Sequence, residues 1–238
     1  MKALILAAGL GSRLKEATKE TPKAMVKINF KPLISFQIEA LKDNNITDIG
    51  VVLGYKSDIL KSYLLENHKD INFSFFINDE YEFTNSAFSF YCAKEFVNED
   101  SYIHLNCDIL FSKELLSMII KSKHSNVIAI SKNIQLTDNM EQVELDNKNK
   151  IIKMDNMKFK EASFKAYGLA KLSSKSTKYI NDKIQELLKQ NNKNENYYGI
   201  IREAVLDINY YGIDSNNLFL FEVNTLKDLK KANQKLEK

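Results

Sequence analysis

Two hydrophobic patterns alternate along the first 135 residues of this 238-residue sequence. Apolar runs such as KALILAA and DIGVVLG are followed by segments such as ISFQIEALKDNN and ILKSYLLENH, which have the spacing of amphipathic helices. A strand that is apolar throughout has to be covered on both faces, as in parallel sheets whose connections are helices. The pattern therefore predicts an α/β fold with an open, mainly parallel sheet flanked by helices on both faces.

The pattern changes at about residue 136. MEQVELD, IIKMDN and SFKAYGLAKLS are typical of hairpin strands, so we expect the sheet to be mixed. Two helices are expected next, in STKYINDKIQELLKQNN and NYYGIIREAVLDI, and the chain closes with the strand LFLFEVNT and the helix LKDLKKANQKLEK. Because no proline-rich linker or repeat interrupts this order, we expect residues 1–238 to form a single domain with a small hairpin and helical extension.

Composition excludes several classes of protein. Hydrophobic residues make up 44% and charged residues 27%, which is ordinary for a globular chain. No apolar run approaches the roughly 18 residues of a membrane span, and the start lacks the features of a signal peptide, so we expect a cytoplasmic protein without a membrane partner. The net charge of +3 is small, and without an arginine-rich run it does not indicate nucleic-acid binding. Cys92 and Cys107 lack metal-ligand spacing and are expected to be free thiols.

The loop LAAGLGSRL follows the first expected strand. It contains Gly9 and Gly11, two of seven glycines, and Arg13, one of two arginines. Ligands of open parallel sheets bind beyond the carboxyl ends of the strands, and glycines let the backbone approach a phosphate closely. The loop has Leu14 where a dinucleotide-binding loop has a third glycine or alanine, and it lacks the Gly-Lys-Ser/Thr ending of a Walker loop. A phosphate-binding loop of another kind is predicted, and a Rossmann oxidoreductase is disfavoured.

The next stretch, TPKAMVKINFKPLI, contains both prolines of the chain. Lys23 follows Pro22, a residue that restricts the backbone. Arg13 offers a planar fork that can bind phosphate oxygens, and Lys23 offers a compact charge. Together they would suit a triphosphate.

LAAGLGSRL, TPKAM and KPLI, in this order, resemble the signature of the nucleotidyltransferases that join a nucleoside triphosphate to a sugar or alcohol phosphate and release pyrophosphate. The resemblance extends over nearly the whole chain and implies their Rossmann-like fold. It implies a nucleotide-binding core in residues 1–135, an acceptor-side extension in 136–215, and a metal-ligand strand and closing helix in 216–238. The implied nucleotide contacts are Leu6, Ala7, Ala8, Gly9, Gly11, Ser12, Arg13 and Lys23, of which Arg13 and Lys23 would be catalytic.

A metal site is expected at the same edge of the sheet. Asp108 ends the apolar run SYIHLNCD, and in FEVNT the residues Glu222 and Asn224 alternate with Val223, so that they project to one side of a strand. Mg²⁺ prefers oxygen ligands and commonly takes one or two carboxylates with waters and substrate phosphates. The resemblance implies Mg²⁺ as the cofactor, with Asp108, Glu222 and Asn224 as its ligands and Asp108 also in the nucleotide site. Relatives often have aspartate at the position of Asn224. An amide oxygen can still bind the metal, but it contributes no negative charge.

The stretch INDEYEFTNSAFSFY resembles the base-recognition loop of compact cytidylyltransferases that activate phosphocholine, aminoethylphosphonate or glycerol phosphate. That likeness implies contacts from Asn78, Tyr81 and Asn85 to the cytidine nucleotide and its acceptor. Relatives often have a phosphate-contacting lysine where this chain has Asn156, so a nearby lysine is expected to serve instead. The candidate acceptor-binding residues are Lys153, Lys158, Lys160 and Tyr167.

The function predicted from these features is a Mg²⁺-dependent cytidylyltransferase that uses CTP and a small phosphorylated alcohol or phosphonate, for decoration of a cell-surface polysaccharide or lipid. A cage of aromatic side chains for a quaternary ammonium group is one possibility for the acceptor, although the spacing of Phe88 and Tyr91 also suits a buried helix face. A UTP- or dTTP-dependent sugar 1-phosphate nucleotidyltransferase is the first alternative. A nucleotide-binding module with weak catalysis is the second, favoured by Asn224 and Asn156. The three histidines show no motif and are expected to be structural.

Overall fold

A large mixed β-sheet forms the centre of the computed structural model, which describes residues 1–98 and 100–236. Within these residues the sheet has nine strands in the order β10-β9-β11-β6-β1-β4-β5, with β8 paired to β11 and β12 paired to β8. The strands are β1 (Lys2–Ala7), β4 (Asp48–Leu53), β5 (Asn72–Ile77), β6 (Tyr102–Asn106), β8 (Val127–Ser131), β9 (Gln142–Leu145), β10 (Ile151–Asp155), β11 (Phe164–Leu172) and β12 (Tyr211–Asp214).

The direction of the strands follows the two sequence patterns. The neighbours β5, β4, β1 and β6 are parallel, whereas β11 runs antiparallel to β6, β8 and β9. The expected mixed sheet, with a parallel part built from the first half of the chain, is confirmed. Strand β12 was not predicted from the sequence, and it pairs in parallel with β8.

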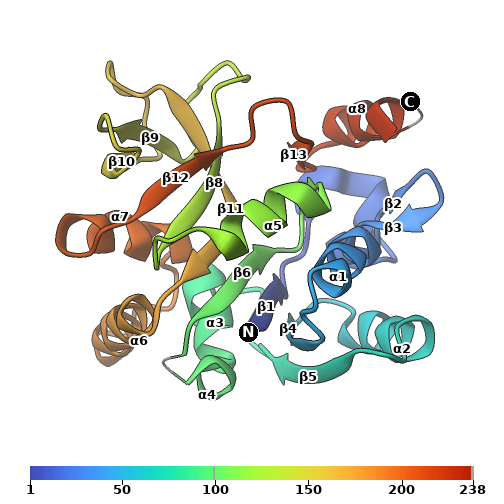
Figure 1. Cartoon of the computed structure of the whole chain (residues 1–238). Coiled ribbons are helices and arrows are strands. Elements are labelled where there is room, and N and C mark those ends of the chain that lie inside the picture. Colours follow the sequence, from blue (N-terminus) through green and yellow to red (C-terminus); the bar gives the residue numbers. More distant parts are fainter. Residues whose placement is uncertain (99, 237–238) are drawn as a thin grey trace.

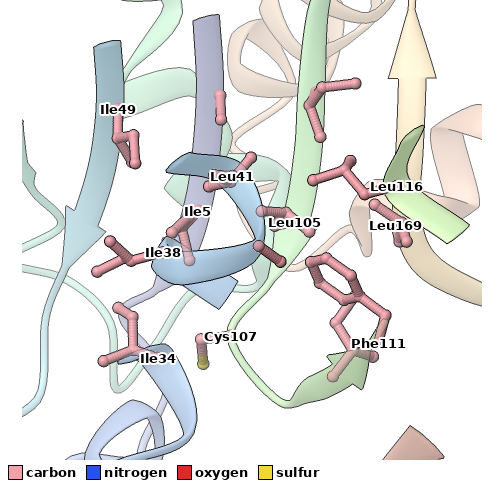
Figure 2. Close-up of a cluster of buried hydrophobic side chains, with 14 of the residues drawn as sticks. Ile5, Ile34, Ile38, Leu41, Ile49, Leu105, Cys107, Phe111, Leu116 and Leu169 are labelled. Atoms are coloured by element: carbon pink, nitrogen blue, oxygen red, sulfur yellow. The ribbon is translucent and has the colours of Figure 1, made fainter. Parts of the chain in front are cut away.

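Helices cover both faces of the sheet, as predicted (Figure 1). One face packs against α1 (Leu33–Asp43), α2 (Ser57–Asn67) and α5 (Lys113–Lys121). The other packs against α3 (Ser86–Cys92), α4 (Lys94–Val97), α6 (Ser174–Lys189) and α7 (Tyr197–Asp207). Figure 2 shows the first of these cores, where Ile5 and Leu105 of the central strands lie beside Ile38 and Leu41 of α1.

Short elements join the end of the chain to its beginning. β7 (Ile109–Phe111) pairs antiparallel with β13 (Leu220–Glu222), and α8 (Leu226–Leu236) packs beside the β2 (Lys27–Ile28) and β3 (Lys31–Pro32) hairpin (Figure 1). Their shared apolar core includes Leu14, Leu110 and Val223. This core fixes the last strand against the segment that follows β6. The metal-ligand strand expected from the sequence is thereby held next to Asp108.

The expectations drawn from composition concern membrane spans and cysteines. Across residues 1–98 and 100–236, the structure contains no helix with the length and apolar character needed to cross a membrane. Both cysteines are free thiols, with Cys107 buried and Cys92 half-buried. Burial raises the pKa of Cys107 to about 12, so its thiol stays protonated at neutral pH.

His104 is a fully buried titratable group of β6, and its burial makes the stability of the fold depend on pH. Its ring stacks on Tyr197 with centroids 4.2 Å apart, and Nε2 lies 3.1 Å from Asn106 Oδ1. Burial lowers the pKa of His104 to about 4. The unfolded chain takes up this proton near pH 6.5, so the folded state loses stability as the pH falls from 6.5 towards 4, by about 2 kcal/mol at pH 5.

The measurement is urea unfolding at a series of pH values, with His104→Gln as the comparison. The variant is expected to lose the part of the pH slope between 6.5 and 4 that this group supplies. An equal slope in both proteins would contradict the assignment.

Candidate functional site

A cleft of about 1000 Å³ opens at the carboxyl ends of β1 and β6. Its lining comes from segments 8–13, 84–86, 106–108, 137–141, 165–168, 221–222 and 224–225. The predicted site residues that line it are Leu6, Ala8, Gly9, Gly11, Ser12, Arg13, Lys23, Tyr81, Asn85, Asp108, Tyr167, Glu222 and Asn224. The structure therefore has a cavity at the edge of the sheet where the parallel strands predict a ligand site.

The glycine loop is held tightly against the Lys23 segment. Gly11 has φ of +65°, and a Cβ added there would lie 3.0 Å from Lys23 Cβ and 3.0 Å from Thr18 Cγ2. The hydroxyl of Thr18 donates to the Gly11 carbonyl at 3.0 Å. At Gly9, by contrast, an added Cβ would meet nothing within 4 Å, because the loop faces the open cleft. Glycine at position 11 thus permits the close approach that brings Lys23 into the cleft.

Four of the predicted residues form one polar network. Lys23 Nζ donates to Asp108 Oδ2 at 2.7 Å and to Asn224 Oδ1 at 2.8 Å. Arg13 Nη2 donates to the same Asn224 oxygen at 2.7 Å. The Lys23 and Asp108 side chains are 12% and 15% exposed, so their charges are shielded from bulk water. Residues from the two ends of the chain thus meet at one point, and they place two cations beside the glycine loop.

The oxygen atoms around this network fit a divalent cation. Asp108 Oδ1 is buried and has no hydrogen-bond partner, while its other oxygen accepts from Lys23. Glu222 lies opposite Ile109 in the β7–β13 pair, and the Val223 N–H donates to the Asp108 carbonyl at 2.8 Å. In the described part of the chain, no three His, Cys, Asp or Glu side chains form a metal site by themselves. Two carboxylates and an amide nevertheless match a Mg²⁺ site completed by waters and substrate phosphates.

Lys165 is a cleft residue that the sequence reasoning missed. It projects from β11, its side chain is 8% exposed, and it forms an ion pair with Glu222. Its ammonium lies 4.5 Å from the centroid of the Tyr167 ring. Burial, with the nearby Glu222 charge, raises the pKa of Tyr167 to about 12, so the phenol stays protonated. The sequence signal was period two, which puts Lys165 and Tyr167 on one face of a mostly apolar strand.

A second charged pair joins Glu141, which lines the cleft, to Arg202, which does not. Arg202 Nη1 donates to both oxygens of Glu141, at 2.7 and 2.9 Å. Burial raises the pKa of the Glu141 carboxyl, and the Arg202 charge opposes that rise. Tyr198, which also lines the cleft, donates from its hydroxyl to the Tyr167 carbonyl at 2.6 Å. No motif marked Glu141 or Arg202, because they meet only through the packing of α7 on the sheet.

The predicted base-recognition loop divides into two roles. Tyr81 and Asn85 line the cleft, and Asn85 Oδ1 also accepts from Ser86 N at the start of α3. Asn78 is buried and does not line it. Its Nδ2 donates to Thr84 Oγ1 and Ser89 Oγ, both at 3.0 Å. Asn78 therefore holds the loop in shape while its neighbours face the cavity.

The other predicted residues are not brought to the cleft. Ala7 is buried within β1, and Lys153 and Lys158 are absent from the lining. Lys153 Nζ lies over the Phe159 ring, 4.3 Å from its centroid, and the Lys158 N–H donates to Asp138 Oδ1. Lys153 belongs to β10, the outermost strand on its side of the sheet. Lys160, the third candidate lysine, does not line the cleft either, whereas Lys165 of β11 does.

The aromatic side chains considered for a cage do not all lie in the cleft. Tyr81, Tyr167 and Tyr198 line the cleft. Phe88 stacks on Tyr91 with centroids 6.5 Å apart, outside the cleft lining. Phe88 and Tyr91 therefore do not contribute to a cage in the cleft, and the aromatic side chains of its lining are the three tyrosines and Phe221.

Comparison with known proteins agrees with this geometry. The profile of the family described as "Nucleotidyl transferase" matches residues 2–153. The CTP:phosphoglutamine cytidylyltransferase of Campylobacter jejuni is 42% identical over 137 residues, which are 56% of this chain and 53% of that relative. This chain thus spans about half the length of that relative.

Two further likenesses extend over more of the chain. The D-glycero-alpha-D-manno-heptose 1-phosphate guanylyltransferase of Campylobacter jejuni is 31% identical over 169 residues, covering 71% of this chain and 72% of that one. The solved CTP:phosphocholine cytidylyltransferase of Streptococcus pneumoniae superposes with a TM-score of 0.79 and 22% identity over 99% of this chain and 98% of that chain, which shows a shared fold. By its family profile, its cleft and its fold, this chain belongs to the nucleotidyl transferase family.

Proposed function

We propose that this protein is a Mg²⁺-dependent cytidylyltransferase that transfers CMP from CTP to a small phosphorylated alcohol or phosphonate and releases pyrophosphate. The observation that carries the proposal is the network of Arg13, Lys23, Asp108 and Asn224 beside the glycine loop. The 42% identity to a cytidylyltransferase supports the choice of CTP. A cytoplasmic location and a role in cell-surface decoration are part of the same proposal.

The chemistry requires positioning and charge neutralisation rather than a protein nucleophile. A phosphate oxygen of the acceptor attacks the α-phosphorus in line and forms a new P–O bond. The bond between the α-phosphorus and the oxygen that bridges it to the β-phosphate breaks at the same time. The electron pair of the broken bond leaves on pyrophosphate. The glycine loop would approach the phosphates through its backbone, Arg13 would bind the leaving phosphates through its planar fork, and Lys23 would neutralise the negative charge that develops.

Mg²⁺ would be held by Asp108 and Glu222, with Asn224 as an uncharged third donor. When bound, it would add positive charge among the phosphate oxygens. Tyr81 and Asn85 would contact the cytidine side of the nucleotide. Tyr167 and the wall around the Glu141–Arg202 pair would face the acceptor.

A sugar 1-phosphate acceptor is the second candidate. The observation in its favour is the 31% identity to a heptose 1-phosphate guanylyltransferase over 71% of this chain. The same residues would act on the triphosphate, so the two candidates differ in the base and in the acceptor wall.

The test is pyrophosphate release with Mg²⁺, with CTP, UTP, dTTP, ATP and GTP each tried against a panel of acceptors. The panel contains phosphocholine, phosphoethanolamine, aminoethylphosphonate, glycerol phosphates, phosphoglutamine, and hexose and heptose 1-phosphates. Release with CTP and a non-sugar acceptor is the expected result. Release with sugar phosphates alone would replace the acceptor class, and tight CTP binding without release from any pair would favour a nucleotide-binding module.

A further inference from the structure

The side chain of Lys165 places an ammonium group in the wall of the cleft, where it is largely buried. Its residue is 6% exposed, and burying such a charge is costly unless a partner neutralises it. The partner is Glu222, one of the two carboxylates that fit a divalent cation. The charge of Lys165 is therefore balanced by a carboxylate that is also proposed to hold the divalent cation.

Lys171, on the same strand, shows what a structural lysine looks like here. It is 7% exposed, and its Nζ donates to the backbone carbonyls of Ser122 at 2.7 Å and Ile120 at 3.3 Å. Those acceptors belong to the end of α5 and the turn after it, and Lys171 does not line the cleft. Lys165 differs because it has a carboxylate partner and an open cavity beside it.

The strand order places Lys165 on one side of the reacting groups. β11, β6 and β1 are consecutive in the sheet, so Lys165 on β11, Asp108 after β6 and the glycine loop after β1 follow one another across the cleft. β11 and β1 are two strand spacings apart, roughly 10 Å. A triphosphate on the glycine loop would have its α-phosphorus near Asp108. In-line attack then needs the acceptor's phosphate on the far side from the loop, which is the side of Lys165.

We propose that Lys165 binds the phosphate of the acceptor, and that Glu222 holds its ammonium at the cleft until a divalent cation takes that carboxylate. The inference rests on the proposed function for its acceptor and extends it to a residue outside the sequence motifs. Arg13 and Lys23 already face Asn224 and Asp108 on the loop side. Lys165 supplies the cation that an incoming phosphate dianion requires on the β11 side.

This arrangement predicts two effects of opposite sign for Lys165→Met. The KM for the acceptor should rise by about 10- to 100-fold, because a charge-assisted hydrogen bond to phosphate is lost, while the KM for CTP stays within a few-fold of wild type. Binding of Mn²⁺ to the substrate-free protein should become several-fold tighter, because the ammonium no longer competes for Glu222. A merely structural lysine would lower the melting temperature without producing this pair of effects.

The experiment compares wild type, Lys165→Met, Lys165→Gln, Lys165→Arg and the control Lys171→Met. Acceptor and CTP kinetics are measured with phosphocholine, glycerol 3-phosphate and any other acceptor that the panel identifies, and Mn²⁺ binding is measured by electron paramagnetic resonance. Lys165→Arg keeps the charge and should restore much of the acceptor affinity. Lys171→Met should lower the melting temperature and change neither the acceptor KM nor Mn²⁺ binding. Lys165→Gln provides a second neutral variant if the methionine variant folds poorly.

The outcomes separate this inference from the proposed function. If wild type turns over and both neutral Lys165 variants keep the wild-type acceptor KM, the inference is overturned and the cytidylyltransferase proposal stands. If wild type releases no pyrophosphate with any pair, the proposed function fails, and Mn²⁺ binding alone decides about Lys165. Unchanged Mn²⁺ affinity in both neutral variants then overturns the inference, and tighter binding supports the competition for Glu222.

Discussion

Asp108→Asn is expected to reduce turnover by about 10²- to 10³-fold while the melting temperature stays within a few degrees of wild type. Asparagine has the shape of aspartate and can still accept from Lys23, so the packing of the 15%-exposed side chain is kept. What it loses is the negative charge and the second carboxylate oxygen, which is buried without a partner in the present structure. The measurements are pyrophosphate release under saturating substrates and thermal unfolding without ligand.

Asp214→Asn is a matched control. Asp214 is the last residue of β12, whereas Asp108 follows the end of β6; the Asp214 side chain is 18% exposed and does not line the cleft. Its replacement is expected to leave turnover unchanged. A large loss of melting temperature in Asp108→Asn with unchanged specific activity would show that Asp108 is structural.

Lys23→Ala is expected to lower turnover by a similar factor, about 10²- to 10³-fold. The substitution removes the ammonium that bridges Asp108 and Asn224, and with it the positive charge proposed to act on the α-phosphate. Asn224 keeps its hydrogen bond from Arg13, so the loop retains part of its anchorage. The measurement is kcat and KM for CTP, with kcat carrying most of the loss if Lys23 acts in the transition state.

Two comparisons make the Lys23 result specific. Lys27→Ala removes an exposed lysine of the same segment that does not line the cleft, and it should have no effect on kcat. The double variant Asp108→Asn with Lys23→Ala should be little worse than either single variant, because groups that act as a unit are not additive. Fully multiplied losses would mean that the two side chains act independently.

The helices and strands of the first half of the chain could be predicted from the sequence because their hydrophobic patterns are local. Apolar runs became β1, β4 and β6, and the amphipathic segments that follow them became α1, α2 and α5 near the expected boundaries. The glycine loop and Lys23 were also found from the sequence, since glycine spacing and a proline before a lysine are features of neighbouring residues. β12 was missed, because a four-residue strand is stabilised by its pairing to β8 rather than by its own sequence.

The charged pairs at the cleft could not be predicted from local sequence patterns. Lys165 and Glu222 are 57 residues apart, and Arg202 and Glu141 are 61 apart, so no spacing rule joins them. Lys153 was a candidate because it lies near Asn156, where relatives often have a lysine, yet it belongs to the outermost strand on its side of the sheet. Sequence proximity was a poor guide there because adjacent residues of a strand point to opposite faces, and adjacent strands can lie far from the ligand edge.

The sequence by itself determined the class of fold, the position of the glycine loop and the identity of the groups beside it, because strand and helix periodicity, glycine spacing and proline positions act over a few residues. Only the tertiary structure decided which charged groups face one another. The pairing of β7 with β13 brings Glu222 to Asp108, and the order β11-β6-β1 places Lys165 beside them. Those contacts depend on long-range strand pairing and on burial, because a buried ammonium needs polar partners, which are a carboxylate for Lys165 and backbone carbonyls for Lys171.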